Sequence, residues 1–152
     1  MNYEQWQQLF GRAADDTGVA AAISQAGISK VLTIGADELS VAADIPGQGL
    51  TIVFTDESIL RPGVGLVGRP VLTSVTMILK HPSSPLYRGP LPHGLTPDTT
   101  RDAMRQRFGA PIEIGEGRPW EVFRVEGLDL APTYSRDLQS IARLTLRVPG
   151  GR

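Results

Sequence analysis

The sequence predicts an α+β fold in which an antiparallel sheet carries its helices on one face. Three observations lead to this prediction. Each half of the chain begins with helical periodicity and continues with short runs of alternating apolar residues. The strand-like runs follow one another through short turns, as in an antiparallel meander. A faint internal repeat, Gly49–Leu79 and Gly127–Leu146, ends each half with two such runs, which indicates two helix-plus-meander pseudo-repeats.

Length and composition are those of one ordinary globular unit. We expect residues 1–152 to form a single domain, with pseudo-repeat halves at about 1–80 and 87–149. No run of about 18 apolar residues predicts a membrane span. The N-terminus lacks the basic region and apolar core of a signal peptide, and the absence of cysteine excludes disulfides and thiolate chemistry. These features predict a cytoplasmic protein.

Two helices are expected at the start of the first half. Aromatic residues recur at helical spacing and predict a helix over residues 3–10, with Trp6 as a core anchor. Asp15 or Asp16 can accept hydrogen bonds from the free amides of a second helix over residues 17–25. A glycine follows that helix and is a natural stop.

Four strands are expected in the rest of the first half. Val31–Ile34 and Leu39–Ala43 are short candidates, and Leu50–Phe54 alternates as a strand with one buried face does. Leu72–Leu79 is nearly all β-branched or apolar and predicts a central strand. The glycine- and proline-rich stretch Ile59–Pro70 predicts an exposed, mobile loop that the second copy lacks.

The second half follows a proline-rich connector, His81–Gly94. Thr96 as a cap and the proline after it predict a helix that runs to residue 108, with Arg101 and Arg105 facing solvent. Strands are then expected over Ile112–Ile114, Trp120–Val125, Leu128–Tyr134 and Leu138–Val148. Pro132 lies inside the third of these runs and predicts an edge position or a bulge.

Charge is distributed unevenly along the chain. Residues 1–60 hold eight acidic and two basic side chains, a net charge of −6, whereas residues 61–152 hold thirteen basic and eight acidic ones, a net charge of +5. Such polarity can steer a charged partner. A paired-repeat fold would mix the two halves, so we expect much of the asymmetry to vanish on folding.

No reactive constellation is evident in the sequence. His81 and His93 are the only histidines, and no spacing typical of a metal site accompanies them. Glycines at 63, 65 and 68 have the spacing of a dinucleotide-binding loop but lack the strand–turn–helix context. The basic helix face at residues 101–107 has no aromatic platform. We therefore expect no enzymatic activity, no metal or cofactor, no nucleic acid or membrane partner, and no small-molecule ligand.

Adjacent acids at two expected turns suggest a protein partner instead. Neighbouring carboxylates in a turn point apart, which disfavours shared acid–base catalysis, but they can form a surface for a basic partner. Loops of the kind expected at residues 61–70 often contact partners. The candidate partner-binding residues are Asp37, Glu38, Asp44, Asp56, Glu57, Val64, Leu66 and Arg69.

A longer motif lies between Tyr87 and Pro111. It consists of Tyr-Arg-Gly-Pro-Leu-Pro-His-Gly-Leu-Thr at 87–96, then Arg101, then Phe-Gly-Ala-Pro at 108–111. This pattern resembles small bacterial immunity proteins of polymorphic toxin and secreted-effector systems, including relatives of pyocin-type immunity proteins. Residues 9–16, the Gly-Leu pair at 49–50 and Trp120 are similar as well, so the likeness spans nearly the whole chain.

The resemblance implies a non-enzymatic inhibitor that binds a cognate toxin in the producing cell. Such a protein covers the toxin's active site or locks its fold, and charge complementarity speeds the association. Two alternatives remain open. A secretion chaperone or adaptor would bind an apolar segment of an effector, and a small enzyme would use a pocket that the sequence does not reveal.

Overall fold

A computed structural model describes residues 1–151 and confirms the α+β fold. One seven-stranded antiparallel sheet runs through these residues, together with four α-helices and one short 3₁₀ helix. In chain order the elements are α1 (Tyr3–Gln7), α2 (Thr17–Gln25), β1 (Ser40–Ile45), β2 (Leu50–Asp56), α3 (Glu57–Leu60), β3 (Pro70–Ile78), η1 (Pro92–Gly94), α4 (Arg101–Phe108), β4 (Glu113–Ile114), β5 (Glu121–Val125), β6 (Leu128–Tyr134) and β7 (Ile141–Arg147).

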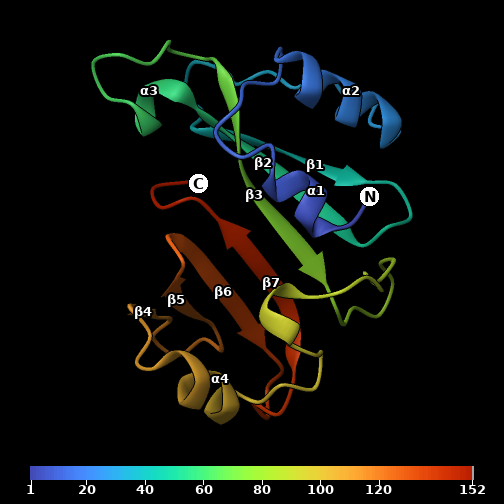
Figure 1. The fold of residues 1–152 in the computed structure, drawn as a ribbon, viewed down its shortest axis with the longest axis vertical. Helices are drawn as coiled ribbons and strands as arrows, with labels where there is room; N and C mark the ends of the chain where they lie inside the picture. Colours follow the sequence, from blue (N-terminus) through green and yellow to red (C-terminus); the bar gives the residue numbers. More distant parts are fainter. Residues whose placement is uncertain (152) are drawn as a thin grey trace.

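The two halves of the chain stay apart within the sheet. The strand order is β1-β2-β3-β7-β6-β5-β4, so the halves meet only where β3 pairs with β7. Figure 1 shows the blue-to-green half above this seam and the yellow-to-red half below it. Residues 1–80 carry a net charge of −3, from eight acids and five bases, and residues 81–152 a net charge of +2, from eight acids and ten bases. The prediction that the two halves mix on folding was wrong. The acidic and the basic half therefore occupy different ends of the sheet.

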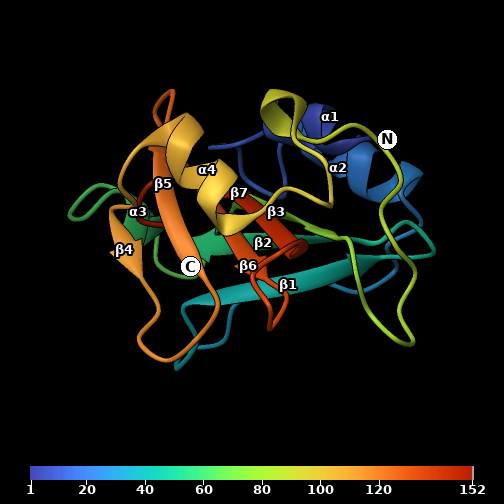
Figure 2. The ribbon, with the colours of Figure 1, turned by 90° about the horizontal axis from the view of Figure 1, so that it is seen from below.

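The helices cover one face of the sheet. Figure 2 shows α1, α2 and α4 on the same side of the strands. Trp6 is fully buried there, which confirms it as a core anchor, and it belongs to one apolar cluster with Val19 of α2. Cross-strand neighbours such as Ile52 and Val75 complete that core, and burial of each large side chain contributes roughly 1.5–3 kcal/mol. The opposite face of the sheet carries no helix in the described residues.

Two predictions for the first half were wrong in detail. The first helix ends at Gln7, not at residue 10, and Val31–Ile34 does not form a strand. This segment lies beside β1, where Lys30 Nζ donates to the Ala42 carbonyl at 2.8 Å, but Val31 is 77% exposed. Leu32 packs against the edge of the core and is half-buried, but the segment has no neighbouring strand with which its backbone pairs.

The start of α4 also differs from the prediction. The helix begins at Arg101, and the hydroxyl of Thr100 accepts from the backbone amide of Ala103 at 3.1 Å. Pro97 cannot begin the helix because its carbonyl accepts from the amide of Ile141 at 2.8 Å. This long-range bond ties the preceding segment to β7 and delays the helix by one turn.

The arginines of α4 face the sheet more than was expected. Arg105 Nε donates to a carboxylate oxygen of Glu121 at 2.8 Å, and its Nη2 contacts the same oxygen. Glu121 is only 2% exposed, and its second oxygen accepts from the Tyr134 hydroxyl at 3.1 Å. Arg101 is half-buried, with an Nε that has no partner in residues 1–151. The prediction that Arg101 and Arg105 face solvent was wrong because a buried carboxylate on β5 draws this helix face inward.

Of the two positions predicted for Pro132, an edge or a bulge, the edge was wrong because the residue lies in an internal strand, whereas an irregularity in the strand is present beside it. β6 pairs with β5 on one side and β7 on the other. Opposite Pro132 the β5–β6 ladder is interrupted, and it resumes only as a bridge between Trp120 and Thr133. A register shift follows at once, between Thr133 and Tyr134. The missing N–H of proline is thus accommodated by an irregular ladder.

Candidate partner-binding site

The loop of residues 61–70, called here the 61–70 loop, carries an exposed apolar tip. It joins α3 to β3 and projects at the upper left of Figure 1. Val64 is 83%, Leu66 61% and Val67 86% exposed. Leu39 is also exposed, and its carbonyl accepts from the amide of Asp56 at the base of the loop at 3.0 Å. These four side chains, Leu39, Val64, Leu66 and Val67, are called the apolar patch below.

Two buried carboxylates hold the base of this loop. One oxygen of Asp56 accepts from the amide of Ser58 at 2.9 Å, and the other accepts from the amide of Gly68 at 2.8 Å. Glu57 Oε1 accepts from the amide of Leu66 at 2.8 Å. Asp56 and Glu57 are each only 6% exposed. The expectation that they form an exposed acidic turn was wrong, because the loop backbone folds over them.

Hydrogen bonding keeps Asp56 ionised. The Ser58 hydroxyl, which donates at 2.7 Å, has the largest effect, and the amides of Gly68 and Ser58 add to it. Together they hold the pKa of the Asp56 carboxyl below its ordinary value of 3.8. The charged acceptor that the loop requires is therefore present throughout the neutral and mildly acidic range.

The loop is further tied to α3 through its own backbone. The amide of Arg61 donates to the Glu57 carbonyl at 2.9 Å, and the amide of Gly65 donates to the Arg61 carbonyl at 2.7 Å. Gly65 lies so close to α3 that a Cβ atom there would stand 2.3 Å from the Glu57 carbonyl oxygen. These contacts oppose the mobility expected from the sequence. The apolar tip is presented on a fixed base.

Arginines surround the same base. Arg61 and Arg69 lie 3.4 Å and 3.5 Å from Glu57 Oε2, and Arg69 also lies 3.4 Å from Asp15. They line a cleft of about 500 Å³ whose walls also include Arg12 and Asp16. Three arginines face three carboxylates here, so the cleft is electrically balanced and offers no excess charge to an ionic ligand.

The structure gathers most, but not all, of the residues predicted to bind a partner. Val64 and Leu66 are exposed on the loop, and Arg69 is half-buried at its base. Asp37 and Glu38 are exposed in the segment that leads to Leu39. Asp44 is separate from this group, because it lies on β1 and accepts from the Thr51 hydroxyl at 2.7 Å.

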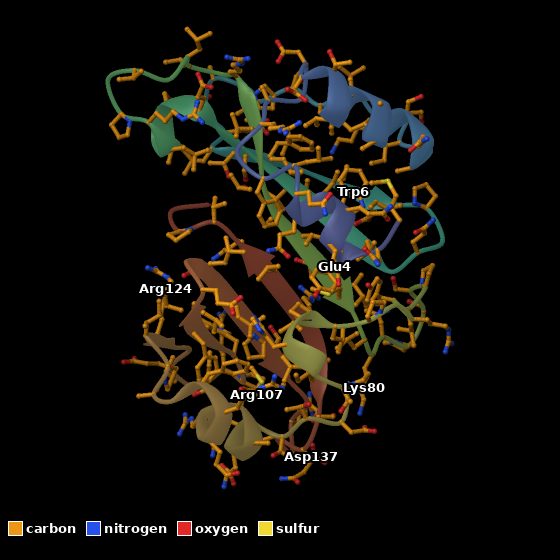
Figure 3. The ribbon with its side chains drawn as sticks, viewed as in Figure 1. Glu4, Trp6, Lys80, Arg107, Arg124 and Asp137 are labelled. Atoms are coloured by element: carbon orange, nitrogen blue, oxygen red, sulfur yellow. The ribbon has the colours of Figure 1, made fainter. Side chains whose placement is uncertain are left out.

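Sequence reasoning missed a polar relay at the β6–β7 turn. Lys80 Nζ donates to Ser140 Oγ at 2.7 Å, Ser140 Oγ donates to Ser135 Oγ at 2.8 Å, and Ser135 Oγ donates to Asp137 at 2.6 Å. Figure 3 labels Lys80 and Asp137, the two ends of this relay. Because the ammonium of Lys80 is the donor, it cannot withdraw a proton from Ser140 in this arrangement. The relay connects a cation to an anion across a turn.

The two histidines do not meet in a common site. Nδ1 of His81 accepts from the amides of Ser83 and Ser84, and the His93 ring packs edge-on against Phe108 with centroids 5.6 Å apart. Among residues 1–151 no three histidine, aspartate or glutamate side chains are grouped so that they could hold a metal ion. No helix in the same residues has the length and apolar character needed to cross a membrane.

No family model matches the chain, and comparisons with curated proteins and with solved structures find no match either. The features that bear on function are therefore those of the molecule itself, above all the apolar patch and the carboxylates beneath it.

Proposed function

We propose that this protein is an immunity protein that binds and neutralises a cognate toxin or effector in the cytoplasm of the producing bacterium. It acts by occlusion, without catalysis. The observation that carries the proposal is the apolar patch on the 61–70 loop, exposed on a base that buried Asp56 and Glu57 hold in place. The resemblance of residues 87–111 to immunity proteins points to the same function.

A fixed apolar protrusion suits the occlusion of a partner's cleft. Binding is opposed by the loss of loop entropy, and a loop that is already ordered in the free protein avoids much of that cost. Exposed apolar groups that are contiguous and rimmed by polar residues mark interaction sites more often than isolated ones do. Val64, Leu66 and Val67 are exposed within four consecutive residues of the loop.

Charge near the patch favours a basic toxin surface. Asp37 and Glu38 are exposed in the segment that leads to Leu39. The half of the molecule that carries them, residues 1–80, has a net charge of −3. Acidic side chains at the rim of an interface mainly raise the association rate of a basic partner, and their effect weakens as salt is added.

The test is co-expression with the protein encoded by the adjacent gene. We expect that protein to kill cells when expressed alone, to be tolerated with this chain, and to form a stoichiometric complex with it. A Leu66→Asp/Val67→Asp variant should remain folded and lose protection. Ile112→Asp/Ile114→Asp is the matched control, because that pair on and before β4 is also exposed and apolar.

Three outcomes would count against the proposal. A neighbouring protein that is harmless by itself would remove the need for immunity. Full protection by the Leu66→Asp/Val67→Asp variant would remove the apolar patch from the interface. A complex that forms only with an unfolded or secreted segment of the neighbour would favour a secretion chaperone instead.

A further inference from the structure

The sheet face opposite the helices is built of three rows of paired residues that cross the strands. Residues paired in an antiparallel sheet project from the same face, so the register defines each row. Starting in the second half of the chain, the rows are Trp120–Thr133–Arg143–Ile78, Ala131–Thr145–Thr76–Thr51–Asp44, and Arg124–Asp129–Arg147–Ser74–Val53. We call this surface the open face.

The two outer rows carry long side chains, and the middle row carries short ones. Trp120 and Arg143 stand in the first row, and Arg124 and Arg147 stand in the third. These rows are four residues apart along each strand, or about 13 Å at the usual rise per residue. Between them, Thr145 and its neighbours leave a flat strip of small side chains that are half-exposed.

The polar side chains of the strip are hydrogen-bonded to one another. The Thr76 and Thr145 hydroxyls are 2.8 Å apart and hydrogen-bond to each other across the seam of the sheet. A partner that covers these hydroxyls would therefore leave few hydrogen-bond donors unsatisfied. Asp44 stands exposed at the β1 end of the same row, with one oxygen bound by the Thr51 hydroxyl.

The basic end of the open face has more positive than negative charge. Arg124 and Arg147 share Asp129, at 2.6 Å and 3.5 Å, and that carboxylate is only 6% exposed. Arg143 is exposed and forms no ion pair within residues 1–151. This end of the open face thus holds three guanidinium groups, one of them half-buried at Arg147, for one buried carboxylate. Figure 3 labels Arg124 on the strands of the lower half of the molecule.

We propose that the open face is a second binding surface, for a polypeptide segment that lies across the strands. Acidic side chains of that segment meet the arginines over β5, β6 and β7, and a basic side chain meets Asp44 at the other end. Tryptophan and arginine are the residues most enriched at the energetic centres of protein interfaces. The open face shares no residue with the apolar patch. Its test is therefore independent of the test of the proposed immunity function.

The same observations favour a polypeptide over a nucleic acid. A phosphate backbone carries one sign of charge along its whole length and would be repelled where the middle row ends at Asp44. Proteins that bind single-stranded nucleic acids also use several aromatic side chains for stacking. Trp120 is the one aromatic side chain in these three rows. A polypeptide can match both signs of charge.

The probe is a fluorescein-labelled 16-residue peptide with four glutamates in its first half and two lysines in its second half. We expect weak, salt-dependent binding by anisotropy, with amide shifts in NMR spectra concentrated in β5–β7 and at Thr76. Arg143→Glu should weaken binding about tenfold, which corresponds to about 1.4 kcal/mol. The matched control is Arg107→Glu, an equal charge change at an exposed position on α4, and it should leave binding unchanged.

Arg143 is chosen because it has no ion pair to lose, so its variant should fold as the parent does. Thermal unfolding of both variants checks this directly. The proposal is overturned if the peptide does not bind, if the shifts fall on the helix-covered face, or if both variants weaken binding equally. Tighter binding of oligothymidine at the same residues would also overturn it, in favour of a nucleic-acid surface.

Discussion

Replacing Gly65 by alanine should release the 61–70 loop from α3. A Cβ atom at this position would lie 2.3 Å from the Glu57 carbonyl oxygen and 2.6 Å from its carbonyl carbon. Both are backbone atoms of a helix, so the loop must move rather than its neighbour. The movement breaks the bond from the Gly65 amide to Arg61 and the bond from the Leu66 amide to the Glu57 carboxylate.

The size of the effect follows from those two bonds. A neutral backbone hydrogen bond contributes about 1 kcal/mol and one to a charged acceptor about 2 kcal/mol, so the variant should lose about 3 kcal/mol of unfolding free energy. Gly63→Ala is the matched control. Its φ of +79° carries strain of about 1 kcal/mol, but nothing lies within 4 Å of the added methyl group.

Urea denaturation measures the loss of unfolding free energy, and amide hydrogen exchange measures the release of the loop. Gly65→Ala should lower the urea midpoint well below that of Gly63→Ala and speed exchange at the amides of Leu66 and Gly68. Exchange at those amides should be little changed by Gly63→Ala. Equal midpoints and unchanged protection at both amides would refute the idea that close contact with α3 fixes the loop.

Three further substitutions probe other parts of the fold. Glu121→Ala removes the carboxylate that accepts from both the Tyr134 hydroxyl and the Arg105 guanidinium. It should lower the unfolding free energy measured in urea by about 3 kcal/mol, against about 1 kcal/mol for Tyr134→Phe. Similar losses in the two variants would mean that the ion pair adds no stability. Because hydrogen bonds lower the folded-state pKa of Asp56, its contribution is complete above pH 3.8 and is lost as pH falls through the lowered value. Hydrogen exchange at the Gly68 amide should therefore speed up as pH falls through that value. Asp56→Asn should abolish this acid-dependent increase, and an increase that persists in the variant would assign it to another group. Gly49→Ala places a methyl group 2.1 Å from the Tyr87 amide nitrogen at a φ of +66°, so the melting temperature should fall sharply, and a fall of only a degree or two would contradict this packing.

The sequence predicted those elements whose signal is local. Alternation in Leu50–Phe54 and the β-branched run from Leu72 predicted β2 and β3, because a strand with a buried face must place apolar side chains at every second position. Asp16 does cap α2, through bonds to the amides of Gly18 and Val19. Each of these features depends on residues only a few positions apart.

Features that depend on distant partners were missed. The helix cap lies at Thr100 because the Pro97 carbonyl is bound by β7, 44 residues further on. Asp56 and Glu57 are buried because amides up to 12 residues away need acceptors. One local signal could have indicated the second case: two acids that follow a buried strand directly, before a glycine-rich loop with many free amides.

The most direct test of the account is the affinity of the apolar patch for the cognate toxin. Isothermal titration calorimetry would compare the parent with Leu66→Ser/Val67→Ser and with Ile112→Ser/Ile114→Ser, which alters an equally apolar exposed pair elsewhere. Two interface anchors together contribute about 3 kcal/mol, so the loop variant should bind roughly 100-fold more weakly. The control should bind as the parent does. Parent-like affinity in the loop variant would contradict the central claim that the 61–70 loop binds the toxin.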